Sequence, residues 1–431
     1  MNASLQPQAY ELTDLQPVPQ QLRCLWLSRD IPFPQDAGDR IYSANLASAL
    51  ARANVEVRYL GYLQSSADAV PEEWVTNWIA VNGPKRSEHV ALLSRYPRIA
   101  AVHATRSYRE LLQRQLQEPW DAIVLDGYAS GWALEECVQA RARHSAYGKA
   151  PVLVYLSHNH EESLWQAMTR ATDSLSIKRL GVWQNYRKAR ALERAMVEQV
   201  DLVTTITPED ARTYARQQRG TSKPAAKVVL TPGYAGPTRA TRRINKGTPR
   251  HVVMMGSYRW LIKQENLRRL VQLADSVFAE RNIVLDVIGD VPNELLQELQ
   301  PKVRATRFHG FVDDVSTYFE QARLALVPEV VGGGFKLKFL DYVFGRVPVV
   351  TIRAASAGVP QALADCMLPC DDLQALVNTV INAIDNVDTL NQLQEQAYQR
   401  AASLFRWQDR GYALAAAIRK CEDRGVRGDS A

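Results

Sequence analysis

The segment LALVPEVVGGGFKLKFLDYVFGRVPVV (Leu324–Val350) decides the fold class, because an apolar strand ends at a proline and three glycines precede a lysine-bearing helix. Glycines permit close approach of a ligand to the backbone, and amides at a helix N-terminus bind anions. Lys336 and Lys338 are predicted on the first turn, where a bound phosphate would offset their repulsion from the helix dipole. Asp341 is predicted on the same side and could accept hydrogen bonds from ligand hydroxyls, such as those of ribose. The alternative is a glycine-rich turn with solvated lysines.

Short apolar runs and helical stretches alternate evenly upstream of this segment. The pattern predicts strands at 251–255, 284–288, near 308 and at 324–327, with helices at 265–280, 292–299 and 315–320. Strands that alternate with helices indicate a parallel sheet covered on both faces. After Val350 the chain is predicted to be mostly helical.

The first half repeats the alternation more loosely, with strands predicted at 24–27, 55–60, 122–125, 152–156 and 202–206. The fold class is therefore α/β, with two Rossmann-like doubly wound domains that face each other across a cleft. We predict a flexible lead-in over 1–21, a first domain over 22–235 and a second over 250–404. The stretch 236–249, rich in Gly, Pro, Thr and Arg, is predicted as the linker.

Composition limits the class of protein. The 431 residues, 46% apolar and 23% charged, are too many for one ordinary core and suit a folded globular chain. The net charge of +6 leaves cations for phosphate groups without implying nucleic acid. Five scattered cysteines indicate neither a disulfide framework nor a zinc site, so we expect a reducing cytoplasm. We expect no signal peptide and no membrane-spanning helix, and therefore at most a peripheral membrane contact.

The glycine-rich segment resembles that of the family-4-type glycosyltransferases of the GT-B fold, also called glycosyl transferases group 1. In that family a P-x-x-x-G-x-G-x-x-x-K-x-L-E-A-x-x-x-G-x-P-V-V segment closes over a donor nucleotide sugar. The residues in this frame are Gly334, Lys338, Asp341, Gly345, Pro348, Val349 and Val350. Asp341 replaces the usual second glutamate, and Gly333 stands where the first would be.

The resemblance extends over nearly the whole chain. In the second half it implies that Gly256, Arg259 and Lys263 approach the diphosphate, and that Gly310, Phe311 and Val312 line the nucleobase. The FRW motif at 405–407 implies a last segment, 405–431, whose helix packs back on the N-terminal domain. Two basic residues in a loop can equally be solvated surface.

In the first half, the resemblance places Gly38 in a loop near donor phosphates and acceptor, with Arg40 beside a ligand charge. The alternative there is a plain β-α turn. The segment SHNHEE matches the family's H-N-x-E motif, which implies that His158, Asn159 and Glu161 are catalytic. A histidine at a strand end could hydrogen-bond the transferred sugar or take an acceptor proton, although such residues often only pack or cap.

The resemblance implies a hexosyltransferase-like enzyme that moves a sugar from a nucleoside diphosphate sugar to a glycan, a lipid-linked saccharide or another hydroxyl compound. Cationic groups at the leaving diphosphate make a metal unnecessary, no cofactor besides the donor is expected, and the outcome is expected to be retaining. The alternatives are a sugar-nucleotide epimerase of the same fold and a non-catalytic binding protein. A nucleic-acid-binding protein is a further alternative, although no recognised motif supports it.

Overall fold

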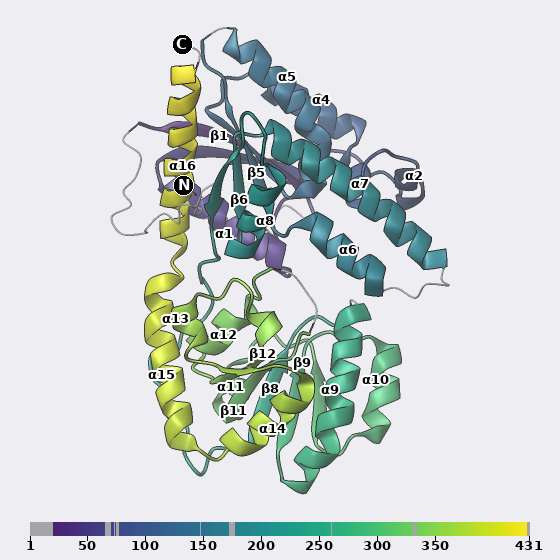
Figure 1. Ribbon diagram of the computed structural model, residues 1–431, viewed down its shortest axis with the longest axis vertical. Coiled ribbons are helices and arrows are strands. Elements are labelled where there is room, and N and C mark those ends of the chain that lie inside the picture. The colour runs from purple at the N-terminus through teal and green to yellow at the C-terminus, as the bar shows by residue number, and fades with distance from the viewer. Residues whose placement is uncertain are drawn as a thin grey trace. The chain divides into compact units, whose positions relative to one another are not determined.

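The computed structural model describes residues 20–64, 70–72, 74, 77–146, 148–171, 177–259, 261–330 and 334–428. The chain splits into two compact units, one formed by Met1–Gly233 with Trp407–Ala431 and the other by Tyr234–Arg406 (Figure 1). Each unit is an α/β domain built on a parallel sheet, which confirms the predicted fold class.

The described residues of the first unit form a seven-stranded sheet with the strand order β3-β2-β1-β4-β5-β6-β7, and all neighbouring strands are parallel. Every residue of the central strands β4 and β5 is buried, as expected for strands with helices on both faces. The strands are β1 (Leu22–Asp30), β2 (Val55–Tyr62), β3 (Asn77–Ala80), β4 (Ala122–Asp126), β5 (Val152–Ser157), β6 (Leu202–Thr205) and β7 (Ala226–Val229).

Helices flank this sheet. Leu25, Ile123 and Leu153 of the sheet share one buried cluster with Leu112 of α4 and Met196 of α7. The helices are α1 (Gly38–Arg52), α2 (Glu88–Leu92), α3 (Arg98–His103), α4 (Arg106–Gln115), α5 (Leu134–Ser145), α6 (Glu161–Ala171), α7 (Ile177–Gln199) and α8 (Pro208–Gln217), with a 3-10 turn at Tyr128–Ala133.

The last helix, α16 (Trp407–Gly428), belongs to the first unit and packs against α1. A Cβ atom on Gly411 would lie 2.1 Å from the Ala49 carbonyl oxygen, so only glycine permits this approach of the two helices. Arg410 donates from Nε to the Thr231 carbonyl over 2.7 Å. The predicted return of the C-terminal helix to the N-terminal domain is therefore confirmed.

The described residues of the second unit form a six-stranded parallel sheet with the order β10-β9-β8-β11-β12-β13, which is the order of a Rossmann sheet. The strands are β8 (His251–Met255), β9 (Val284–Ile288), β10 (Thr306–Gly310), β11 (Ala322–Val327), β12 (Val349–Ile352) and β13 (Leu368–Cys370). The helices are α9 (Leu261–Glu280), α10 (Asn293–Leu299), α11 (Ser316–Gln321), α12 (Lys338–Phe344), α13 (Gln361–Ala364), α14 (Leu373–Ala383) and α15 (Val387–Leu404), with 3-10 turns at Gln300–Lys302 and Arg353–Ser356.

The stretch 236–249, expected to be a linker, packs on the second unit instead. Ile244 is buried in that unit's core, and Arg242 donates to the Arg346 carbonyl over 2.8 Å. The Arg323 side chain donates from Nη2 to the Thr248 carbonyl over 2.7 Å. Among the described residues, no helix has the length and apolar character needed to cross a membrane.

Candidate active site

His158 and Asp126 meet where β5 and β4 end. The Nε2 atom of His158 lies 2.7 Å from Asp126 Oδ1, while Trp26 Nε1 and the Tyr59 hydroxyl donate to Oδ2 over 2.9 and 3.1 Å. Gly127 follows Asp126 with φ of 69°, and a Cβ there would lie 3.3 Å from His158 Cδ2. The strand ends thus fix one imidazole nitrogen on a buried carboxylate.

The charge state of His158 depends on that carboxylate. Burial disfavours the imidazolium, but the hydrogen bond to Asp126 and its negative charge outweigh burial and raise the pKa of His158. Burial likewise opposes the Asp126 anion, and the bond to His158 nevertheless holds the pKa of Asp126 below its usual value. The other nitrogen, Nδ1, is buried and has no hydrogen-bond partner among the described residues. Nδ1 therefore has a hydrogen-bonding position that the described residues leave unused.

Glu161 and Asn159 have a different environment from His158. Glu161 begins α6, and burial together with the charge of Glu193 raises its pKa well above the usual value. Its side chain bonds to Asn159 and Trp165. Of the predicted H-N-x-E residues, the structure therefore gives His158 a carboxylate partner, whereas the environment of Glu161 disfavours its charged form.

The predicted N-terminal loop residues lie at the start of α1. Gly38 is the first residue of this helix, and Arg40 follows in its first turn. Arg40 forms an ion pair with Asp36 and donates from Nη2 to Gln64 Oε1 over 3.0 Å. Its charge is therefore partly offset inside the protein, and its contact with a ligand stays a prediction.

Three glycines gather at the carboxyl ends of strands in the second unit. The Gly256 amide donates to the Ile288 carbonyl over 3.0 Å, and the Gly289 amide donates to the Gly310 carbonyl over 2.7 Å. A Cβ on Gly289, whose φ is 121°, would lie 1.9 Å from the Gly256 oxygen. Gly310 has φ of 68° with open space beside it. This edge therefore keeps its backbone accessible.

A lysine cluster lies next to these glycines. Lys338 pairs with the buried carboxylate of Glu329, and a Cβ on Gly256 would lie 3.7 Å from Lys338 Nζ. Gly256, Lys263, Glu329 and Lys338 line a pocket of about 10 Å³, together with Met254, Tyr258, Asn266, Leu267 and Pro328. That volume suits about one water molecule.

The electrostatics of this cluster favour an anion. Burial, and then repulsion from Lys338, lower the pKa of Lys263. Burial also lowers the pKa of Lys336, and Lys338 and Lys263 add repulsion that Glu329 partly offsets. Burial opposes the Glu329 anion, yet Lys338 holds its pKa below the usual value. In the part of the chain that the structure describes, Lys263, Lys336 and Lys338 repel one another and are each attracted by Glu329, so a bound anion would relieve their repulsion.

The helix that follows begins later than expected. α12 starts at Lys338, so Lys336 precedes the helix rather than lying on its first turn. Gly334 has φ of 70°, a conformation suited to glycine, whereas Gly333 lies outside the described residues. Among the described residues, the groups here that could attract an anion are the lysine side chains, because α12 has only seven residues.

Asp341 of α12 faces Tyr234 instead of the lysines. Burial raises its pKa to about 6, and the bond from the Tyr234 hydroxyl only partly opposes that rise. The Tyr342 hydroxyl accepts the Met255 amide over 2.7 Å and so fastens α12 to the end of β8. The predicted contact of Asp341 with ribose remains a prediction.

The remaining predicted residues are more exposed. Arg259 pairs with Asp290 over 2.5 Å on the surface, and Phe311 is an exposed aromatic side chain. Val312 packs partly against the core. These positions can meet a ligand, but the described structure does not bring Arg259 into the lysine cluster.

Two residues of these sites were missing from the sequence prediction. Asp126 ends the apolar run AIVLD immediately before a glycine, which is a signal for a side chain at the carboxyl edge of a parallel sheet. Glu329 follows the proline that ends β11 and lies in the same loop as the glycines. Its place in a motif that contains two lysines could have indicated Glu329 as their partner.

Residues 249–386 match the family model described as glycosyl transferases group 1. The second unit is a group 1 glycosyltransferase domain. The glycine-rich segment, the lysine cluster and the three strand-end glycines all lie within the matched range. With this domain and the GT-B fold, the chain is a glycosyltransferase, as the resemblance implied.

Solved structures share the fold of this glycosyltransferase. Anabaena HepE, in complex with UDP and glucose, is 13% identical with a TM-score of 0.60, and the match covers 93% of this chain and 100% of HepE. WaaG, a glycosyltransferase involved in lipopolysaccharide biosynthesis, is 18% identical with a TM-score of 0.60 and coverage of 91% and 99%. The α,α-trehalose 6-phosphate synthase of Burkholderia multivorans is 11% identical, with a TM-score of 0.62 and coverage of 96% and 99%. No curated protein matches the sequence of this chain.

Proposed function

We propose that this glycosyltransferase moves a sugar from a nucleoside diphosphate sugar to a hydroxyl acceptor. The observation that carries the proposal is the mutual repulsion of Lys263, Lys336 and Lys338, which lie close together beside the buried carboxylate of Glu329. A diphosphate supplies the negative charge that this cluster lacks. Similar structures support the choice of donor, because HepE was solved with UDP-glucose as well as with UDP and glucose.

The lysines would act on the leaving group. Charge builds on the diphosphate as the glycosidic bond breaks, and preorganised cations in a water-poor site stabilise it by several kcal/mol. We propose that the reaction is metal-independent for this reason, needs no cofactor besides the donor, and retains the configuration of the sugar. His158 would donate a hydrogen bond to the transferred sugar from Nδ1 while Asp126 holds Nε2.

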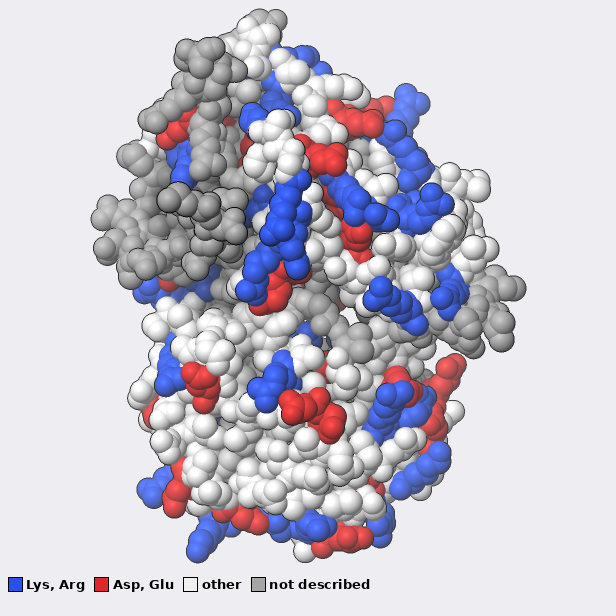
Figure 2. Space-filling model, in the orientation of Figure 1, with Lys and Arg blue, Asp and Glu red and all other residues white. Residues whose placement is uncertain are grey.

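The acceptor is proposed to be a glycan or a lipid-linked saccharide. WaaG, which shares the fold, takes part in lipopolysaccharide biosynthesis. On the face in view in Figure 2, Lys and Arg lie among Asp and Glu rather than in one continuous basic stripe. That pattern on this face favours a small anionic ligand over a nucleic-acid backbone.

The test replaces Lys338 with alanine and with arginine. We expect Lys338→Ala to weaken binding of the nucleoside diphosphate about tenfold or more and to slow turnover, and Lys338→Arg to restore only part because guanidinium geometry differs. Lys302→Ala, at an exposed lysine of the same unit, is the matched control. Calorimetric titration with UDP and GDP measures binding, and release of nucleoside diphosphate measures turnover.

The same assay separates the alternative functions. A transferase releases the nucleoside diphosphate only when an acceptor is present, an epimerase converts the donor without one, and a binding protein does neither. Unchanged affinity and turnover in Lys338→Ala would remove the lysine cluster from the donor site.

We also propose that the enzyme contacts the cytoplasmic face of a membrane through the α2/α7 surface, defined by Val90, Leu92, Leu93, Leu180 and Trp183. All five large apolar side chains are exposed, and Leu93 is 90% exposed. Lys188 Nζ donates to the Leu92 carbonyl over 2.8 Å, which joins the two helices. The Arg187 guanidinium lies 5.1 Å from the Trp183 ring centroid. Apolar side chains bordered by cations suit anionic lipid.

Vesicle binding tests this contact without any need for turnover. The protein should sediment with vesicles that contain phosphatidylglycerol more than with phosphatidylcholine alone, and salt should weaken the difference. Leu93→Ser should weaken binding about tenfold, since a buried leucine contributes roughly 1.5 to 3 kcal/mol. Leu273→Ser, at an exposed leucine of the second unit, is the control. Equal binding of Leu93→Ser and wild type would exclude this surface.

A further inference from the structure

The turn that carries His158 and Asn159 is held by side chains of helices from later in the chain. The Ser157 hydroxyl donates to the Asn159 carbonyl over 2.8 Å and lies 2.9 Å from the Tyr214 hydroxyl of α8. Tyr214 also makes a longer bond to the Asn159 carbonyl, at 3.4 Å. Tyr214 therefore contacts the turn on both sides of His158.

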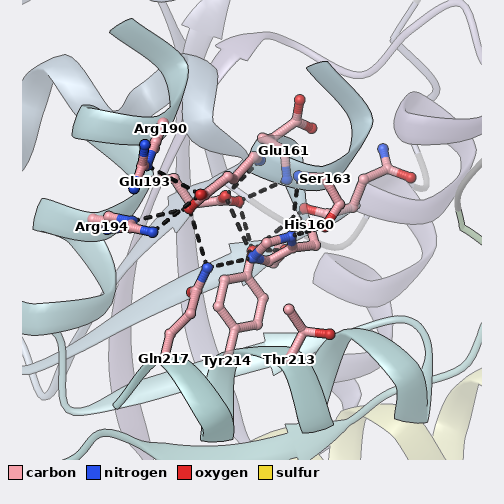
Figure 3. Close-up of polar contacts among 12 residues, drawn as sticks. His160, Glu161, Ser163, Arg190, Glu193, Arg194, Thr213, Tyr214 and Gln217 are labelled. Atoms are coloured by element: carbon pink, nitrogen blue, oxygen red, sulfur yellow. Dashed lines mark hydrogen bonds and ion pairs between the residues drawn. The ribbon is translucent and has the colours of Figure 1, made fainter. Parts of the chain in front are cut away.

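Glu193 of α7 holds the other end of the turn, at the start of α6 (Figure 3). Its Oε1 accepts the Glu161 amide and its Oε2 accepts the Glu162 amide, both over 2.9 Å. The Tyr214 hydroxyl donates to Oε1 over 2.6 Å. The Glu193 side chain is only 1% exposed. One buried carboxylate thus links the first two amides of α6 to the tyrosine that contacts the turn.

His160 and Glu162 make the other polar contacts at the start of α6. His160 occupies the capping position, and its Nδ1 accepts the Ser163 amide over 3.2 Å, while its Nε2 lies 3.9 Å from Glu193 Oε2. Glu162 pairs with Arg190 and Arg194 of α7 over 3.0 and 2.9 Å. Gln217 Nε2 lies 2.8 Å from His160 Nε2 and donates to Glu162 Oε2 over 3.2 Å, so it links these groups. The hydrogen bonds of the described residues give the first two amides of α6 to Glu193.

The two oxygens of Glu193 have separate uses, which makes a carboxylate necessary. A glutamine has one acceptor oxygen and would turn an amino group toward one of the two amides. Burial raises the pKa of Glu193, and its hydrogen-bond donors only partly offset that cost. The two oxygens nevertheless hold the first two amides of α6 at 2.9 Å each, which fixes the geometry of this helix start.

We infer that Glu193 is a positioning residue for His158. It holds the start of α6 and, through Tyr214, the turn at 157–159, so that His158 Nε2 stays on Asp126 and Nδ1 keeps its direction. The inference rests on the proposed role of His158 in sugar transfer. Tyr214 shares this task.

The expected result for Glu193→Gln is a folded protein in which kcat falls about tenfold or more while the KM for the donor changes little, because the donor lysines are in the second unit. The imidazole pKa of His158, followed by NMR, should move down toward its ordinary value of about 6.5 as contact with Asp126 loosens. Asp39 and Arg29, the other charges that act on His158, stay unchanged in this variant. Glu198→Gln, at an exposed position of α7, is the matched control.

A second variant covers the case in which Glu193→Gln does not fold. Tyr214→Phe removes the hydroxyl that links Glu193 to the turn. It should lower both kcat and the pKa of His158, each by less than Glu193→Gln does. A folded variant of either kind with the wild-type pKa of His158 and wild-type kcat would overturn the inference. Normal turnover in His158→Ala would instead contradict the proposed role of His158, and the NMR titration would still report on positioning.

Discussion

Asp341 gives the second unit a pH dependence with a definite sign. Burial raises its pKa to about 6 in the folded chain, against about 3.9 when unfolded. Between those values the folded state holds a proton that the unfolded state has lost, so the free energy of unfolding falls as pH rises through this window. We expect Asp341→Asn to lack this slope and to melt a few degrees above wild type at about pH 8 but not at about pH 4.

The same carboxyl should control donor affinity if it binds ribose hydroxyls. A carboxylate accepts stronger hydrogen bonds than a neutral acid, so affinity should rise as pH rises through about 6. Calorimetric titration of wild type and Asp341→Asn at several pH values measures this. A pH-independent affinity in wild type would place the ribose elsewhere.

The sequence predicted some residues of the candidate sites and missed their partners. The motif frames singled out His158 and Lys338; the structure places His158 at the carboxyl end of β5 and pairs Lys338, at the start of α12, with Glu329 just after β11. Their partners were missed, because Asp126 lies 32 residues from His158 in the chain and reaches it only through the pairing of β4 with β5. Motifs specify which residue types occur, whereas sheet order decides which of them meet.

At the scale of elements, the strand-end turns of β8 and β9 depend on one glycine. A Cβ on Gly289 would lie 1.9 Å from the Gly256 oxygen, and φ of 121° is strained for any other residue. We expect Gly289→Ala to lower the melting temperature of the second unit and to weaken nucleoside diphosphate binding. Gly181→Ala, in α7 with nothing within 4 Å, is the control and should be neutral or slightly stabilising. Wild-type melting of Gly289→Ala would show that the two turns can separate at little cost.

Elements with strong local signals were predictable. β8 and β9 have the predicted bounds, and α9 begins at Leu261, four residues before its prediction. The short strands β3, β7 and β13 carry weak apolar patterns of three or four residues and were not predicted. Such edge strands form because a neighbouring strand offers hydrogen bonds, and a local pattern does not record that.

At the scale of the whole molecule, the first unit is built from two separate segments of the chain, whereas the second is built from one. Removal of residues 407–431 takes α16 away from α1 and from Thr231. We expect the truncated chain to lose the unfolding transition of the first unit and all turnover, while the second unit still binds nucleoside diphosphate with nearly unchanged affinity. Differential scanning calorimetry with and without nucleotide separates the two transitions. Two transitions in the truncated chain would show that the first unit does not require α16.

The assignment of α16 to the first unit also determines the order of folding during synthesis. Every residue of the second unit, 234–406, leaves the ribosome before the helix that completes the first. The later domain can therefore finish folding before the earlier one, although domains usually fold in chain order. Until the last helix arrives, the apolar face of α1 that it covers remains open to other chains. By covering α1, helix α16 thus helps to protect the first unit of this enzyme from aggregation.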